Sequence, residues 1–79
     1  MPRYFLHLRE KDLDCQDEEG VLLIDDSEAM AAARAGARSL VAEAVMEAHA
    51  IGHERIDVVD AEGRLVGSVA LREVIKFEF

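Results

Sequence analysis

The longest periodic pattern in the chain runs from Ser27 to about Ile51, where apolar residues recur every three or four positions. This spacing places the apolar side chains on one face of a helix and the charged residues on the opposite face. Asp25, Asp26 or Ser27 could each cap the helix N-terminus, Asp25 and Glu28 have capping-box spacing, and Gly52 is a typical residue just beyond a helix end. We therefore predict one amphipathic helix that ends near Gly52.

A shorter period, of two residues, predicts strands before this helix. Residues 2–9 (PRYFLHLR) alternate in this way, and Tyr4, Leu6 and Leu8 share one face. We expect this face to lie against the helix. Residues 21–24 form a second, short apolar run, which we predict to be an edge strand antiparallel to the first.

The clearest hairpin follows the helix. Residues 55–60 (RIDVVD) and 64–71 are two apolar runs joined by the turn sequence 60–63, in which Gly63 supplies the position that needs a positive φ. For residues 72–79 (REVIKFEF) we favour a turn followed by an extended end, with 75–79 outside the core.

The order strand, strand, helix, strand, strand predicts an α+β two-layer sandwich of the β-β-α-β-β type. One helix would lie on one face of a four-stranded antiparallel sheet. A chain of 79 residues corresponds to a single domain, residues 1–79, with a small core. The second sheet face would be uncovered and apolar, and such a surface commonly contacts a second copy of the chain. The predicted interface residues are Phe5, His7, Val59, Val66 and Ala70.

Net charge narrows the partners. The chain carries 9 basic and 17 acidic residues, a net charge of −8, which repels nucleic acid and anionic lipid alike. Its sequence has no apolar run approaching the roughly 18 residues of a membrane span and no signal-peptide pattern. A single cysteine rules out an internal disulfide framework. We expect a cytoplasmic protein that binds neither nucleic acid nor membrane.

The most acidic stretch, residues 10–20, is predicted to be an irregular loop. It does not fit a calcium-binding loop, because Asp17 stands where that pattern needs glycine and Leu23 where it needs glutamate. It suits instead a surface for a basic partner, as in an acidic inhibitor or antitoxin-like protein. The carboxylates of this candidate surface are Asp12, Asp14, Asp17, Glu18 and Glu19.

Residues with catalytic or metal-binding chemistry are few. His49 and His53 are four positions apart, but Gly52 is expected to interrupt the helix between them, so we predict no metal site. Cys15 lies between Asp14 and Asp17, whose negative charge suppresses the reactive thiolate. We predict no catalytic residues and no cofactor.

Four segments together carry a family resemblance. They are residues 1–7 (MPRYFLH), residues 17–20 (DEEG), the alanine-rich helix, and residues 56–60 (IDVVD) followed by Gly63. With them the chain resembles, nearly throughout to about Val74, a family of short bacterial proteins known as domain of unknown function 6894. The resemblance implies a small cytoplasmic domain with no established activity, and it transfers no catalytic or ligand residues.

Three classes of function remain. The most favoured is a homodimeric protein-interaction or adaptor module without catalytic activity. The alternatives are an acidic inhibitor of a basic partner and a small-ligand binder, for which a chain of this length leaves little room for a pocket.

Overall fold

The computed structural model describes residues 1–11 and 14–75 of the chain. Three strands precede a single long helix and two strands follow it, which is the predicted β-β-α-β-β order with one additional short strand. In chain order they are β1 (Arg3–Arg9), β2 (Asp14–Cys15), β3 (Val21–Leu22), α1 (Asp26–Met46), β4 (Arg55–Asp60), β5 (Leu65–Ala70) and the 3-10 helix η1 (Leu71–Val74).

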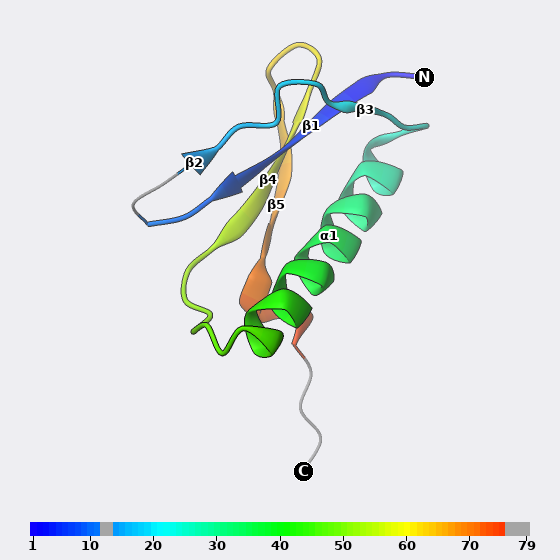
Figure 1. Cartoon of the computed structure of the whole chain (residues 1–79). Coiled ribbons are helices and arrows are strands. Elements are labelled where there is room, and N and C mark those ends of the chain that lie inside the picture. Colours follow the sequence, from blue (N-terminus) through cyan, green and yellow to red (C-terminus); the bar gives the residue numbers. More distant parts are fainter. Residues whose placement is uncertain (12–13, 76–79) are drawn as a thin grey trace.

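The strands form one antiparallel sheet in the order β2-β1-β4-β5, and β3 also pairs with β1 (Figure 1). Because β4 pairs along the length of β1, both β2 and β3 lie on the opposite edge of β1, one at each end. Helix α1 covers one face of this sheet (Figure 1). The α+β two-layer fold predicted from the sequence is confirmed.

Strand β1 has the face assignment that the alternation predicted. Tyr4 is buried, and Leu6 and Leu8 pack against the buried core. The outward backbone groups of this strand pair with β3 at Tyr4 and with β2 at Leu8. Strand β2 lies inside the segment that we predicted to be entirely loop, and it forms because the chain returns antiparallel along β1.

Gly20 directs the chain into β3. Its φ is +72°, and an added Cβ would lie 2.8 Å from the backbone oxygen of Tyr4. Only glycine adopts this conformation so close to a neighbouring strand without strain. Strand β3 is shorter than the predicted strand 21–24, but it pairs antiparallel with β1 as predicted.

The hairpin of β4 and β5 forms around the predicted turn, with Gly63 at φ +85°. The pairing contains an irregularity: Val58 lies opposite Gly67, but Val59 lies opposite Leu65. One residue of β5, Val66, is therefore extra, which is the definition of a β-bulge. The bulge interrupts the simple alternation that we assumed along this strand.

Of the three predicted N-cap residues, Asp25 caps α1: its side chain accepts a hydrogen bond from the backbone N–H of Glu28. The predicted end near Gly52 is wrong. The helix ends at Met46, and Ala48 adopts the left-handed conformation, with φ 57°, that we had assigned to a glycine. The backbone N–H of His49 then donates to the Ala44 carbonyl and closes the last turn.

The core is built on small helix residues that allow close approach to the sheet. Ala29, Ala33 and Ala37 are fully buried on the inner face of α1. The sheet opposes them with larger side chains: Tyr4, Ile56, Val58 and Val69, and Leu71 completes the cluster. Beyond Leu40 the helix passes the end of this core, so Val45 and Met46 are exposed. A longer helix would therefore have no core to cover.

Arg64 ties the start of the helix to the hairpin. Its guanidinium is 2.9 Å from carboxylate oxygens of both Asp26 and Asp60. Asp26 also accepts a 2.7 Å hydrogen bond from the Tyr4 hydroxyl, which raises the pKa of Tyr4 to about 12. The chain ends in the predicted turn, η1, and the part of the predicted extended end at 76–79 lies outside the described residues.

Candidate interaction surface

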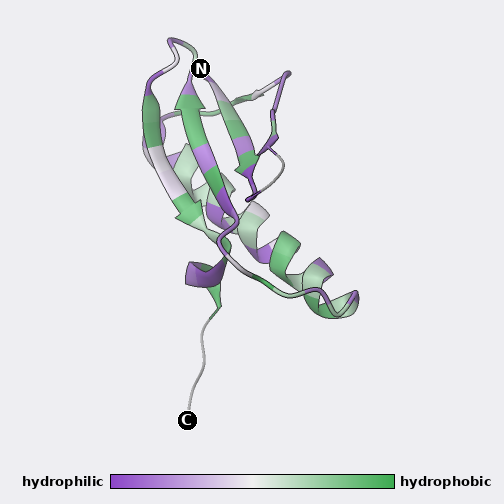
Figure 2. Ribbon diagram, turned by 90° about the vertical axis from the view of Figure 1, so that its left-hand side faces the viewer, coloured by the Kyte–Doolittle hydropathy of each residue, from purple (hydrophilic) through white to green (hydrophobic). Residues whose placement is uncertain are grey.

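No helix of the described residues covers the sheet face opposite α1 (Figure 2). Strand register arranges its side chains in three rows across β1, β4 and β5. The first row is apolar, the second is polar and the third contains two arginines. The rows are Phe5, Val59 and Leu65; His7, Asp57 and Ser68; and Arg9, Arg55 and Ala70.

Asp57 is the centre of the polar rows. It is 8% exposed, and its carboxylate accepts hydrogen bonds from the Arg55 Nε at 2.9 Å, the Arg9 Nε at 3.2 Å and the Ser68 Oγ at 2.6 Å. Burial raises the pKa of Asp57, but these hydrogen bonds outweigh burial and hold the pKa below its ordinary value. The centre of the face is thus a satisfied ionic network rather than the apolar surface that we predicted.

His7 is part of the same layer and is largely buried. Its Nδ1 accepts a 3.0 Å hydrogen bond from the backbone N–H of Asp17, and its ring stacks on Phe5 with centroids 6.3 Å apart. Because His7 is largely buried and both interactions are made within the chain, it offers little surface to a partner.

The apolar row has one exposed residue, Leu65. Phe5 and Val59 are half-buried, whereas Leu65 is 58% exposed. The β-bulge accounts for a difference from the prediction here: Val66 packs against the buried core, and Leu65 lies beside Val59 in its place. Ala70 is half-buried beside Arg55 at the other end of β5. Nothing in the alternation alone identified Leu65 as an exposed residue of this face.

The acidic segment before β3 does not act as one surface. Most carboxylates of this segment are exposed, but Asp17 is half-buried. Its carboxylate accepts hydrogen bonds from the backbone N–H groups of Leu6, Glu19 and Gly20. Partial burial raises the pKa of Asp17, but these hydrogen bonds prevail and lower the pKa overall. Asp17 is therefore a structural residue that organises the segment.

The other candidate carboxylates differ among themselves. Asp14 lies in β2, 3.6 Å from the Arg9 guanidinium, and its side chain is exposed, so this ion pair contributes little. Glu18 and Glu19 are exposed, and Asp12 lies outside the described residues. The predicted acidic surface thus keeps Asp14, Glu18 and Glu19 as exposed members.

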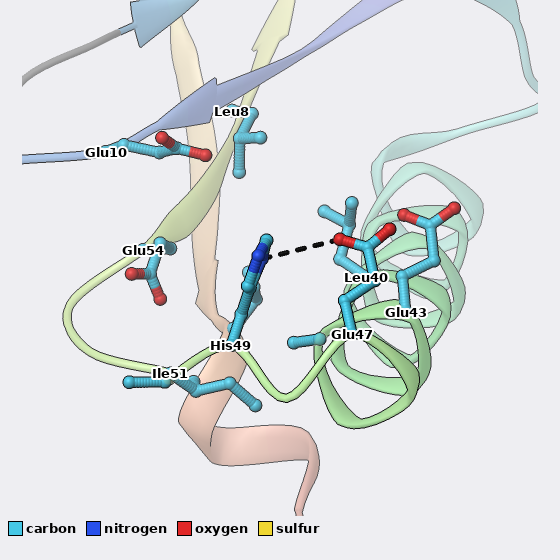
Figure 3. Close-up of a pocket in the computed structure, with 11 residues that line it drawn as sticks. Leu8, Glu10, Leu40, Glu43, Glu47, His49, Ile51 and Glu54 are labelled. Carbon is cyan, nitrogen blue, oxygen red and sulfur yellow. Dashed lines mark ion pairs between the residues drawn. The ribbon is translucent and has the colours of Figure 1, made fainter.

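A groove lies where the last turn of α1 approaches the ends of β1 and β4 (Figure 3). It has a volume of about 300 Å³. Leu8, Leu40, Ile51 and Leu71 are its large apolar residues, and glutamates from three segments surround them: Glu10, Glu43, Glu47 and Glu54. His49 lies 3.4 Å from Glu47 in an exposed ion pair. This groove was not predictable from the sequence, because its shape depends on where α1 ends.

The described residues contain no group of three or more histidine, cysteine, aspartate or glutamate side chains placed to hold a metal ion. Within the same residues, no helix has the length and apolar character needed to cross a membrane.

The described residues form a small open α+β sandwich in which they cover one side of the sheet only. The chain belongs to the family described as Domain of unknown function (DUF6894), whose model matches residues 3–72. No curated protein and no solved structure matches the chain significantly.

Proposed function

We propose that this chain is a non-catalytic protein-interaction module of the cytoplasm that forms a homodimer through the β5 side of its sheet. The exposure of Leu65 carries the proposal. This leucine is 58% exposed at the end of an apolar row on a face that α1 does not cover. A second copy placed there would remove the leucine from water.

The size of the domain supports the same proposal. A chain of 79 residues has a small core, and burial between two copies adds apolar contact that one copy lacks. Burying a leucine side chain fully contributes about 2 kcal/mol, and a twofold interface counts this contribution twice. In the same row, the half-buried Val59 pairs with Leu65, and Phe5 pairs with Val59 on the other side.

Sedimentation equilibrium tests the proposal. We expect the wild-type chain to sediment as a dimer at micromolar concentration, and Leu65→Glu to shift it to monomer, because a charge at the contact must lose its hydration. Val45→Glu is the matched control, since Val45 is also exposed, at 71%, but lies on α1. A wild-type chain that stays monomeric at all concentrations would contradict the proposal.

A second candidate is the binding of a basic partner, and the groove at the end of α1 favours it. Glu10, Glu43, Glu47 and Glu54 surround apolar residues there, an arrangement that suits a lysine or arginine side chain. Titration with a short lysine-rich peptide, followed by amide chemical shifts, tests it. Binding that is lost in the double variant Glu43→Gln, Glu47→Gln but retained in Glu18→Gln, Glu19→Gln would support the groove over the acidic segment.

A further inference from the structure

The two edges of the sheet differ in how their backbone groups are satisfied. On β1, the edge away from β4 is covered at one end by β3 and at the other by β2. Between them, the N–H of Leu6 donates to the Asp17 carboxylate at 3.1 Å. A side chain thus replaces a neighbouring strand at the centre of this edge, and no further strand can add to β1.

The opposite edge, along β5, has this protection only at its end, where the Glu73 carboxylate accepts from the Ala70 N–H. The N–H of Leu71 donates to the Glu54 carbonyl, so Leu71 points toward β4. Backbone groups alternate along a strand, which directs those of Ala70 and Ser68 away from β4. The Ala70 N–H donates to the Glu73 carboxylate at 3.3 Å. The backbone N–H of Ser68, in the middle of the strand, points outward from the edge of the sheet.

The sequence of β5 also suits strand addition. Residues 65–70 (LVGSVA) contain no charge and no proline, two of the features that commonly block an edge. The β-bulge of this strand is at Val66, before the segment 67–70 that contains the outward N–H of Ser68. In Figure 2, β5 forms the left-hand edge of the sheet, with no purple segment, and no described strand lies on its outer side. The exposed Leu65 lies at the start of this strand.

The centre of the uncovered face is a poor alternative surface. Stacking a second sheet on it would remove water from the network of Arg9, Arg55 and Asp57. The Arg55 side chain is 51% exposed and already paired, so a cover would cost its hydration without adding a new partner charge. Pairing at the β5 edge leaves this network in water.

We propose that β5 pairs antiparallel with β5 of a second copy, which joins the two sheets into one continuous sheet across a twofold axis. This inference rests on the proposed homodimer and specifies its contact. The twofold axis presents the same backbone donors and acceptors from both copies, so the interface is self-complementary. The uncharged strand meets itself without opposing like charges along residues 65–70.

Proline at position 68 tests the pairing. Ser68→Pro removes the outward N–H, and a proline whose N–H position faces away from the sheet is compatible with an edge strand. Ser68→Ala is the matched control, because both variants lose the hydroxyl that binds Asp57 but only proline loses the N–H. Phe5→Glu places a charge on the uncovered face, two strands away from the β5 edge.

In sedimentation equilibrium we expect dimers for the wild type, Ser68→Ala and Phe5→Glu. For Ser68→Pro we expect a folded monomer, with a dissociation constant raised about tenfold or more. A Ser68→Pro dimer together with a Phe5→Glu monomer would overturn the edge pairing and leave the homodimer standing, with the face as its contact. A wild-type monomer would overturn both proposals.

Amide hydrogen exchange gives a second measurement that needs no variant. In the dimer, we expect the Ser68 N–H to be protected, and its protection to fall on dilution to monomer. The Val69 N–H, which points toward β4, serves as the internal reference and should stay protected throughout. A Ser68 amide that exchanges equally fast in dimer and monomer would overturn the edge pairing, even if Ser68→Pro fails to fold.

Discussion

Asp57 accepts hydrogen bonds from three side chains on the uncovered face, and each of them comes from a different strand. Arg9 lies on β1, Arg55 on β4 and Ser68 on β5, so one carboxylate fixes the relative positions of three strands. Losing the charge of this largely buried carboxylate would leave the Arg55 guanidinium without its partner and Arg9 with only the exposed Asp14. Asp57 is therefore a structural residue in the middle of the sheet.

We expect Asp57→Asn to lower the free energy of unfolding at neutral pH by about 3 kcal/mol. The lowered pKa of Asp57 also sets a direction in acid. Its contribution is present above the unfolded carboxyl pKa of about 3.9 and is lost as the pH falls through the lower folded pKa. Urea denaturation at pH 7 and across pH 2 to 5, roughly the range below and around that value, checks both parts.

The wild type should lose more stability in this acid range than Asp57→Asn does, although Asp17, whose pKa is also lowered, keeps part of the dependence in both proteins. Glu18→Gln is the control, since Glu18 is exposed and should not affect stability measurably. Equal stability of wild type and Asp57→Asn at neutral pH would show that the network contributes little.

At the scale of the elements, the local sequence marks the start of α1 clearly and its end poorly. Asp25 caps its first turn, whereas its last turn is followed by Ala48 in a left-handed conformation that favours glycine. No glycine or proline ends the helix at this point, and its last turn already lies beyond the core. Its last apolar residues, Val45 and Met46, have no sheet beneath them.

Ala48→Gly should stabilise the domain by about 0.5 to 1 kcal/mol, because glycine adopts positive φ without the steric cost that alanine has. The opposite sign is expected for Ala35→Gly, an exposed position within α1, which should destabilise by about 1 kcal/mol. Thermal melting followed by circular dichroism measures both. A destabilising Ala48→Gly would mean that the helix continues past Met46.

At the scale of the whole molecule, charge and association act against each other. Each copy carries a net charge of −8, so two copies repel at long range even where the contact itself is uncharged. Arg9 and Arg55 pair with Asp57 within the sheet, and Arg64 pairs with Asp60 within the hairpin, so these cations are already engaged within their own chain. The proposed dimer must form against this repulsion.

Added salt should therefore tighten the dimer. Raising the ionic strength from about 0.01 M to about 0.1 M shortens the Debye length from about 30 Å to about 10 Å and screens the repulsion. We expect the dissociation constant to fall and the melting temperature to rise with both salt and protein concentration. Melting temperatures measured at two protein concentrations check this. A melting temperature independent of concentration would contradict association of the folded chain.

The parts of the fold that were predictable depend on local sequence. The alternation of Tyr4, Leu6 and Leu8, the cap at Asp25 and the turn at Gly63 each involve only neighbouring residues. The bulge at Val66 was not visible, because it depends on how β5 aligns with β4, and it exchanged the places of Leu65 and Val66 in our face assignment. Such register effects are set by tertiary pairing.

The candidate surface was less predictable for the same reason. Asp17 looked like one acidic residue among several, and its role depends on the distance in space to the Leu6 backbone. The ionic network was predictable in part, because Arg55 and Asp57 are two residues apart in a strand and so share a sheet face. Arg9 joins them only through the pairing of β1 with β4.

The carboxylate of Asp17 on the β1 edge has a consequence for how large an assembly can become. A sheet with two free edges can grow without limit, whereas a sheet with one free edge and one closed edge stops after a single addition. The closed edge would therefore act as a terminator: pairing at β5 gives a finite particle of two chains, and fibre growth has no second site from which to continue.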